Sequence, residues 1–221
     1  MQILDISPLI SADLDVWPGD TPYSREAVLD MQRGDHITLS HITASLHLGA
    51  HADAPNHYLK DGAGIAERDL SLYFGPCQVI EVDVPRGERV RLRHLQAALA
   101  SGSNAVENVG AKKLAARVLF KTSTFPDPNN WNEDFAALSD ELIDHLAEQG
   151  VQLVGIDTPS LDPQNERDLS AHHAVARHDM AVLECLVLTD IAPGPYTLCA
   201  LPLKLDRADA SPVRAVLLTD D

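Results

Sequence analysis

Cysteine, positive charge and long apolar runs are all scarce in this sequence. The three cysteines, Cys77, Cys185 and Cys199, are odd in number and widely spaced, and none belongs to a C-x-x-C pair. This pattern excludes a disulfide framework, and the apolar runs around Cys185 and Cys199 predict that both are small core residues. No run of about 18 apolar residues occurs, so the sequence predicts no membrane-spanning helix.

Basic residues are few: 17 Lys and Arg stand against 33 Asp and Glu, which gives a formal net charge of −16. This balance argues against nucleic acid or an anionic membrane as a partner, because both are bound through clustered Lys and Arg. The first ten residues, MQILDISPLI, lack the basic start of a signal peptide, so we expect a cytoplasmic protein. Histidine, in contrast, is abundant, with ten residues.

The pattern of apolar residues predicts more strands than helices. Strand-like runs occur at residues 2–9, 38–48, 77–84, 116–121, 151–156, 181–188, 196–203 and 213–218. Helical periodicity occurs at residues 90–99, 138–149 and 169–178, and Gly150 is placed to end the second helix. No internal repeat is present, and the Ser- and Asn-rich residues 100–110 read as a surface loop. We therefore expect one mixed α/β domain over residues 1–221.

The most informative segment is residues 47–57, HLGAHADAPNH, in which three histidines and one aspartate all occupy odd positions. A helix would align His47 with His51 but would turn Asp53 away, and a glycine and a proline also disfavour a helix here. In extended backbone, residues of equal parity point to one side, so a strand-like segment can aim these groups at a common point, with His57 a little further along. Imidazole and carboxylate ligands suit zinc, manganese or iron(II), and the alternative is a polar, solvated sheet face.

A second indication of a metal site is Glu184, which lies inside the apolar run AVLECLVL. A buried, unpaired carboxylate is costly, so Glu184 should be charge-paired, bound to a metal or on an exposed sheet face. His172, His173 and His178 lie shortly before it and offer further nitrogen ligands. The residues alone do not select among these three histidines, since a solvated helix face would hold them equally well.

Residues 47–57 resemble the H-x-G-T-H-x-D-x-P-x-H signature of the metal-dependent cyclase-like hydrolases. Within that family the chain most resembles the bacterial kynurenine formamidases (arylformamidases), over essentially its whole length. The resemblance includes residues 16–22 (VWPGDTP), residues 155–163 (GIDTPSLDP) and the spacing between His172 and Glu184.

The resemblance implies an α/β fold with a swivelling-type β-barrel-like core flanked by helices, a homodimer, and two divalent metal ions per subunit, zinc or else manganese. The implied ligands are imidazoles and carboxylates: His47, His51, Asp53, His172 and Glu184. The first three would bind one ion and His172 the second, while Asp53 and Glu184 would contact both. His57 would be the catalytic acid/base, and Trp17 would contact the aromatic substrate.

The implied reaction is hydrolysis of N-formyl-L-kynurenine to L-kynurenine and formate, on the kynurenine route of tryptophan degradation. A divalent ion lowers the pKa of a coordinated water toward ~7 and polarises the formyl oxygen, and a histidine with a pKa near ~6.5 can carry the proton. The alternatives are a related hydrolase of another aryl amide or of a lactam such as isatin, and a non-catalytic metal-binding protein. A structural domain with incidental histidines is the remaining alternative.

Two features depart from the resemblance. Ala50 stands where the signature has Thr, which removes a hydroxyl next to the site and puts one supporting hydrogen bond in doubt. Residues 101–110 form a longer stretch than in typical relatives and predict a loop insertion.

Overall fold

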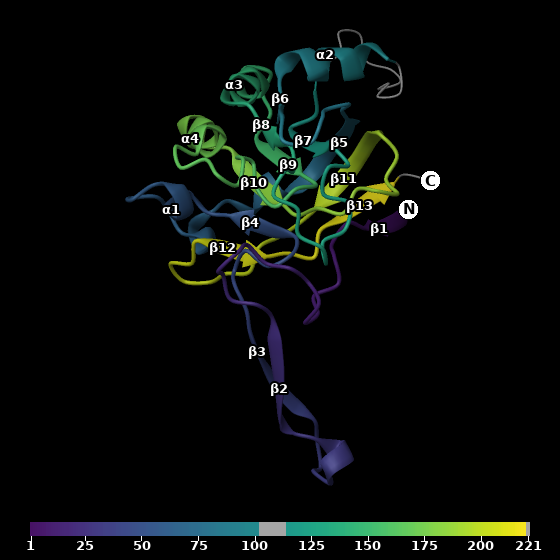
Figure 1. Ribbon diagram of the computed structural model, residues 1–221, viewed down its shortest axis with the longest axis vertical. Helices are drawn as coiled ribbons and strands as arrows, with labels where there is room; N and C mark the ends of the chain where they lie inside the picture. The colour runs from purple at the N-terminus through teal and green to yellow at the C-terminus, as the bar shows by residue number, and fades with distance from the viewer. Residues whose placement is uncertain (102–113, 220–221) are drawn as a thin grey trace.

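A curled sheet of nine strands forms the body of the protein, in the order β1-β13-β11-β5-β7-β9-β10-β4-β12 (Figure 1). This computed structural model describes residues 1–101 and 114–219. The strands of the main sheet are β1 (Gln2–Asp5), β4 (His51–Asp53), β5 (Phe74–Glu81), β7 (Arg117–Lys121), β9 (Leu153–Ile156), β10 (Ala181–Glu184), β11 (Gly194–Cys199), β12 (Ala210–Pro212) and β13 (Val216–Thr219).

The smaller elements complete the fold. Two further two-stranded sheets pair β2 (Ser24–Leu29) with β3 (Leu39–Thr43), and β6 (Arg89–Val90) with β8 (Ala137–Leu138). The helices are α1 (Pro55–Tyr58), α2 (Leu92–Ala100), α3 (Asp140–Glu148) and α4 (Ser170–Arg177). Short 3₁₀ helices occur at Met31–Arg33, Ile65–Glu67 and Leu70–Tyr73.

The centre of the sheet is parallel and buried on both faces. Strands β5, β7, β9 and β10 run parallel in adjacent pairs. Every residue of β7, β9 and β10 is buried, which is why these segments read as continuous apolar runs rather than alternating ones. Gly155 is required on β9, since a Cβ there would lie 2.5 Å from Cδ2 of Leu119 on the neighbouring strand. The central strands thus provide a rigid support for the strand that follows β10 in the sheet.

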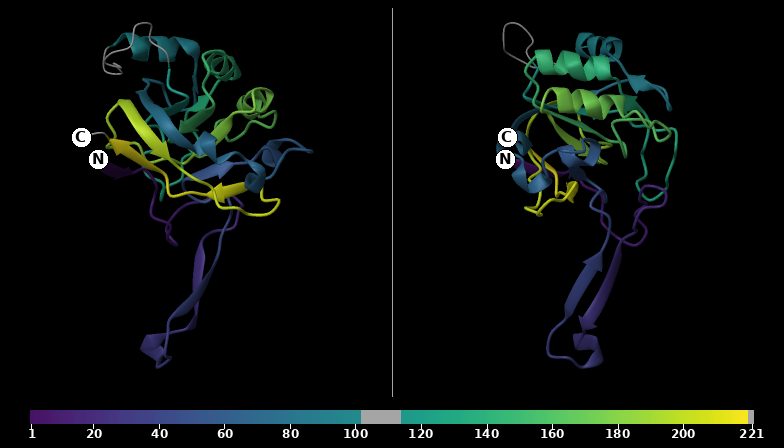
Figure 2. Two further views of the ribbon diagram at one scale, coloured as in Figure 1. Left: turned by 180° about the vertical axis from the view of Figure 1, so that it is seen from behind. Right: turned by 90° about the vertical axis from the view of Figure 1, so that its left-hand side faces the viewer.

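Two hydrophobic cores lie on the two faces of this sheet. Successive residues of β7 point to opposite sides of the sheet, so that Phe120 packs in one core and Leu119 in the other. Helices α2, α3 and α4 cover the first core, where Leu142 and Ile143 of α3 are fully buried (Figure 2). The sheet curls around the second core, so its ends approach each other as a half-barrel. This architecture confirms the expected mixed α/β domain and its barrel-like core.

A long hairpin, formed by β2 and β3 and called here the arm (residues 24–43), projects away from the body (Figures 1 and 2). Its apolar side chains are largely exposed: Val28 by 58%, Met31 by 63%, Leu39 by 50% and Ile42 by 63%. An isolated two-stranded hairpin is at best marginally stable in water, so the arm is a surface that gains stability from being covered.

The positions of most predicted elements are confirmed, with shifts at their ends. The predicted strand at residues 38–48 ends at Thr43, and the helix predicted at residues 138–149 begins at Asp140 because Ala137–Leu138 pairs with β6. Gly150 has a φ of +85° and follows α3, as predicted. Strands β2, β6, β8 and β12 were not predicted. Apart from residues 100 and 101, the expected loop and insertion lie outside the described residues.

Within the residues that the structure describes, no helix is long and apolar enough to cross a membrane.

Candidate metal centre

Strand β4 carries two of the expected ligands into the interior. It pairs antiparallel with β10 on one side and β12 on the other, and this places His51 opposite Glu184. His51 and Asp53 are two residues apart on the strand, so their side chains share one face, as the parity argument predicted. All three residues are at most 3% exposed. Glu184 therefore does not lie on an exposed sheet face.

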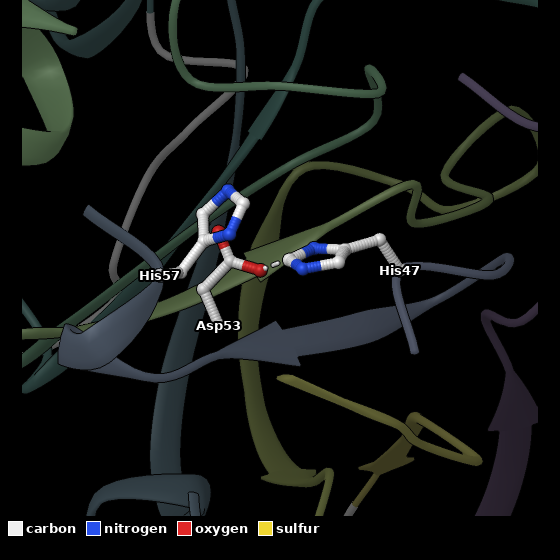
Figure 3. Close-up of side chains that lie close together, drawn as sticks. All are labelled: His47, Asp53 and His57. Atoms are coloured by element: carbon white, nitrogen blue, oxygen red, sulfur yellow. Dashed lines mark ion pairs between the residues drawn. The ribbon is translucent and has the colours of Figure 1, made fainter. Parts of the chain in front are cut away.

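His47 and His57 reach the site from outside the strand, and here the expectation of one extended segment is wrong. The backbone before β4 turns at Gly49, whose φ of +58° lies in the left-handed region that favours glycine. His57 lies on α1, a helix that begins at Pro55, because the fixed φ of proline suits the first helical position. Figure 3 shows that His47 and His57 nevertheless both approach Asp53.

The imidazoles of His51 and His172 both face the two buried carboxylates, those of Asp53 and Glu184. His51 Nε2 lies 3.4 Å from Asp53 Oδ1 and 3.4 Å from Glu184 Oε2. His172 Nε2 lies 3.4 Å from Asp53 Oδ2 and 3.3 Å from Glu184 Oε1. Each carboxylate thus turns one oxygen to His51 and the other to His172.

His47 joins the His51 side of this ring, since its Nδ1 lies 3.0 Å from Asp53 Oδ1. The five expected ligands are therefore brought together, and only His172 of the three candidate histidines on and after α4 takes part. His173 is exposed, and His178 instead contacts Asp144 through Nε2 at 2.8 Å.

A divalent cation fits this donor set. His51 Nε2, His172 Nε2 and both carboxylate oxygens of Asp53 are buried without a hydrogen-bond partner, and such groups are costly unless something else satisfies them. Ligands bound at ~2.0–2.1 Å around a tetrahedral ion lie roughly 3.3 Å from one another. The separations of 3.3–3.4 Å between the Nε2 atoms of His51 and His172 and the carboxylate oxygens match that value.

The electrostatics of the cluster also favour a cation. Burial acts to lower the pKa of His51 and of His172, but the neighbouring carboxylates, above all Asp53 for His51 and Asp162 for His172, outweigh it and hold both pKa values well above the usual one. Burial likewise acts to raise the pKa of Asp53, yet the surrounding histidines hold it well below its usual value. The cluster therefore stabilises positive charge beside Asp53.

Each ligand histidine is fixed from behind by an acceptor. His51 Nδ1 donates to the carbonyl oxygen of Gly49 at 2.8 Å. His172 Nδ1 donates to Asp162 Oδ2 at 2.7 Å, and His47 Nε2 donates to Asp209 Oδ2 at 3.0 Å. When a metal ion is bound, such outer hydrogen bonds orient the ring and leave the other ring nitrogen to face the ion.

His57 lies at the edge of this cluster. Its ring centroid is 4.2 Å from that of His47, and its side chain is 36% exposed. Burial lowers the pKa of His57, an effect that the nearby Asp53 carboxylate only partly opposes. A largely neutral imidazole next to the cluster can accept and return a proton near neutral pH.

A cavity of about 510 Å³ opens onto the ligands and has an aromatic wall. Trp17 and Trp131 line it, with ring centroids 5.5 Å apart in an edge-to-face contact. The size lies within the roughly 300–1,000 Å³ of small-molecule sites. Trp17 is thus positioned to contact an aromatic molecule bound in this cavity.

Cys185 also lines this cavity and is only partly buried, so its prediction as an ordinary core residue is wrong. Its φ of +54° turns the chain directly after Glu184 and brings the thiol to the cavity wall. Cys199 is also only partly buried, and Cys77, rather than these two, is the fully buried cysteine.

Ala50, which stands where the signature has Thr, is buried in the second core, and its carbonyl oxygen accepts a hydrogen bond from the amide of Val213.

Three residues of the site were not singled out from the sequence: Trp131, Asp162 and Asp209. Asp162 lies inside the quoted GIDTPSLDP segment, so a signal for it was present in that segment. Asp209 carries no comparable signal, because it follows two charged residues in a polar stretch and reaches the site only through the pairing of β12 with β4.

Comparison with solved structures shows the same fold in three proteins. One described as a potential metal-dependent hydrolase with cyclase activity is 22% identical, over 98% of this chain and 96% of its own, with a TM-score of 0.78. Isatin hydrolase A from Labrenzia aggregata, bound to benzyl benzoate, is 22% identical, over 99% and 94%, with a TM-score of 0.78. A novel cyclase is 14% identical, over 99% and 88%, with a TM-score of 0.81.

A family model named Cyclase and described as "Putative cyclase" matches residues 4–163. The matched region is more than half of the chain, and it contains β4, α1 and the aspartate behind His172. On this match the chain belongs to the Cyclase family.

Proposed function

We propose that this protein is a metal-dependent amide hydrolase that converts N-formyl-L-kynurenine and water into L-kynurenine and formate. One observation carries the proposal. Buried nitrogen and oxygen atoms of His51, Asp53 and His172 have no hydrogen-bond partner, and they lie beside a cavity with an aromatic wall. The chain's membership of the Cyclase family and its resemblance to the kynurenine formamidases support the choice of reaction.

In this proposal two divalent ions, zinc or else manganese, are held by the five ligands. His47, His51 and Asp53 would hold one ion, Asp53 and His172 the other, and Glu184 would contact both. When bound, such ions supply an activated water at neutral pH and polarise the carbonyl of the substrate.

The chain's own residues supply the rest of the chemistry. Hydrolysis adds water across the bond between the formyl carbon and the aryl nitrogen, and the departing nitrogen needs a proton. His57 lies at the edge of the ligand cluster on the cavity wall, where its imidazole can take the proton of the attacking water and deliver it to that nitrogen. Trp17 and Trp131 would hold the aryl ring and keep water from its face.

A related hydrolase of another aryl amide, or of a lactam such as isatin, is the second candidate. The same ligands, proton carrier and aromatic wall would serve the opening of a cyclic aryl amide. This second candidate is supported by isatin hydrolase A from Labrenzia aggregata, which has the same fold.

We also propose that the protein acts as a homodimer, as its resemblance to the formamidases implies. The exposed apolar side chains of the arm support this, because a second copy would cover a surface that the body of its own chain leaves open.

The function is tested by assaying N-formylkynurenine, formanilide and isatin with one preparation whose metal content is measured. We expect N-formylkynurenine to be the best substrate, chelation to abolish its hydrolysis, and added zinc or manganese to restore it. Full activity after verified removal of metal would refute the metal-dependent reaction. Metal binding without hydrolysis of any of the three would favour a non-catalytic metal-binding protein, and preference for isatin would favour the second candidate.

A further inference from the structure

Asp209 lies between the histidine expected to bind metal and the histidine expected to carry the proton. Its Oδ2 atom is 3.0 Å from His47 Nε2 and 3.8 Å from His57 Nδ1. Among the residues that the structure describes, no other carboxylate forms an ion pair with the Nε2 atom of His47 or with the ring of His57.

The backbone of Asp209 is fixed as firmly as that of the ligand strand. Its carbonyl oxygen accepts a hydrogen bond from the amide of Ala54 at 2.8 Å, and the next residue, Ala210, pairs with Asp53 across the β4–β12 ladder. The side chain of Asp209 therefore stands at a set position relative to Asp53, even though 47% of it is exposed.

The contact with His47 determines which ring nitrogen can face a cation. With Nε2 donating its hydrogen to Asp209, Nδ1 is the ring nitrogen left to face a cation, and it lies 3.0 Å from Asp53 Oδ1. Asp209 stands behind His47 as Asp162 stands behind His172, and partners of this kind typically change metal affinity by about 10–100-fold when they are removed.

The orientation of His47 also affects His57. The two rings are 4.2 Å apart and tilted by 43°, so rotation of His47 would remove the surface against which His57 lies. The distance of 3.8 Å between Asp209 and His57 is too long for a hydrogen bond, so the carboxylate would act on His57 through its charge and through His47.

We infer that Asp209 is a positioning residue that holds His47 in the tautomer that presents Nδ1 to a cation and keeps His57 beside it. The inference rests on the proposed metal-dependent function for its consequence, but the hydrogen bond from Nε2 of His47 to Asp209 is a property of the full chain without metal. Because 47% of the Asp209 side chain is exposed, its replacement removes no buried charge.

The test compares Asp209→Asn, Asp209→Ala and Asp209→Glu with Asp206→Asn, a matched control whose side chain is 95% exposed in the same segment. The ring nitrogens of ¹⁵N-histidine-labelled, metal-free protein are measured by NMR, with His47 assigned from the loss of its signals in His47→Gln. Zinc affinity is measured by competition with a chelator, and kcat and KM are measured on the loaded enzyme.

We expect Nε2 of His47 to carry a hydrogen in the wild type and to carry it only in part of the molecules in Asp209→Ala. Zinc affinity should fall by about 10–100-fold for one of the two ions in Asp209→Ala and Asp209→Asn. The Asp209→Glu variant should regain part of it, and kcat should fall more than KM rises. Unchanged His47 signals and unchanged affinity in Asp209→Ala would overturn the inference. Normal tautomer control by Asp209 in a protein that binds no zinc would instead refute the proposed function.

Discussion

Nδ1 of His172 lies 2.7 Å from Oδ2 of Asp162, and the other oxygen of that carboxylate accepts hydrogen bonds from Arg89 at 3.1 Å. Asp162 is 1% exposed, and it also accepts from the backbone amides of Ala171 and His172. Burial alone would raise the pKa of Asp162, but the His172 imidazole outweighs it and lowers the pKa to about 2. A permanently ionised carboxylate therefore orients the imidazole that faces Asp53 and Glu184.

Replacement of Asp162 by Asn should weaken cation binding by about 10–100-fold, because the amide no longer enforces the tautomer of His172. Chelator competition followed by elemental analysis measures the effect, and circular dichroism checks the fold. The exposed Asp168 gives a matched control, Asp168→Asn, which should bind as the wild type does. Wild-type affinity in Asp162→Asn would show that the contact is not needed for the site.

The His57→Ala variant should lose turnover by about 10²–10⁴-fold while its metal content stays near that of the wild type. The reason is that His57 lies at the edge of the ligand cluster and is not one of the buried residues whose polar atoms lack a hydrogen-bond partner. Turnover of N-formylkynurenine and metal content are measured on the same sample. His173→Ala, an exposed histidine next to a ligand, is the control. A His57→Ala protein that emptied of metal would make His57 a ligand.

Loss of either tryptophan of the cavity wall should raise KM for an aryl formamide more than it lowers kcat. An aromatic contact contributes about 0.5–1.5 kcal/mol, so Trp17→Ala and Trp131→Ala should each raise KM by roughly 2- to 10-fold. Steady-state kinetics measure this, with Phe74→Ala, an exposed aromatic residue outside the cavity lining, as the control. Equal KM values in all four proteins would exclude a role of the wall in binding.

The contact of Asp144 on α3 with Arg177 and His178 at the end of α4 predicts a pH-dependent contribution to stability. Slight burial acts to raise the pKa of Asp144, but its hydrogen bonds to His178 and Arg177 outweigh it and lower the pKa. A lowered carboxyl pKa means that the stabilisation is complete above the unfolded-state value of about 3.9 and is lost as pH falls through the lower folded-state value.

Asp144→Asn should therefore destabilise the fold by up to about 1 kcal/mol at pH 7, since the pair is partly exposed. The same difference is expected at pH 5, and it should shrink below pH 4. Urea unfolding of the wild type and the variant at each pH measures it, beside Asp206→Asn. A difference that grew as the pH fell would contradict the sign of this prediction.

A charge placed on the arm should separate the proposed dimer. Ile42 is 63% exposed on β3, and Ile42→Asp would add a charge where a second copy is proposed to pack. Sedimentation velocity over a range of concentrations should show a dimer for the wild type and a monomer for the variant. Leu9→Asp, at an 82% exposed leucine outside the arm, controls for added charge. A wild-type protein that is monomeric, or a variant that stays dimeric, would remove the arm from the interface.

The sequence predicted most of the central sheet because its strands are buried on both faces. The apolar runs at residues 116–121, 151–156 and 181–188 contain β7, β9 and β10, and Gly150 correctly marked the end of α3. The arm was only half predicted, since exposed strands lack the contrast between apolar and polar faces that marks a strand.

The candidate site was predicted in its residues but not in its geometry. Parity correctly grouped His51 with Asp53, yet it could not show that Gly49 turns the chain before β4 or that Pro55 begins a helix. Asp209 was out of reach, because only the pairing of β12 with β4 places it near the histidines. Contacts between distant segments are what the local pattern of a sequence does not contain.

The pairing of β4 with both β10 and β12 has a consequence for the order of events during synthesis of the chain. The first histidines of the site are translated early, but their strand has no hydrogen-bonded neighbour until residues 181–184 and 210–212 have left the ribosome. The candidate cation site therefore forms only after these late segments have been synthesised, although its first histidines are made early.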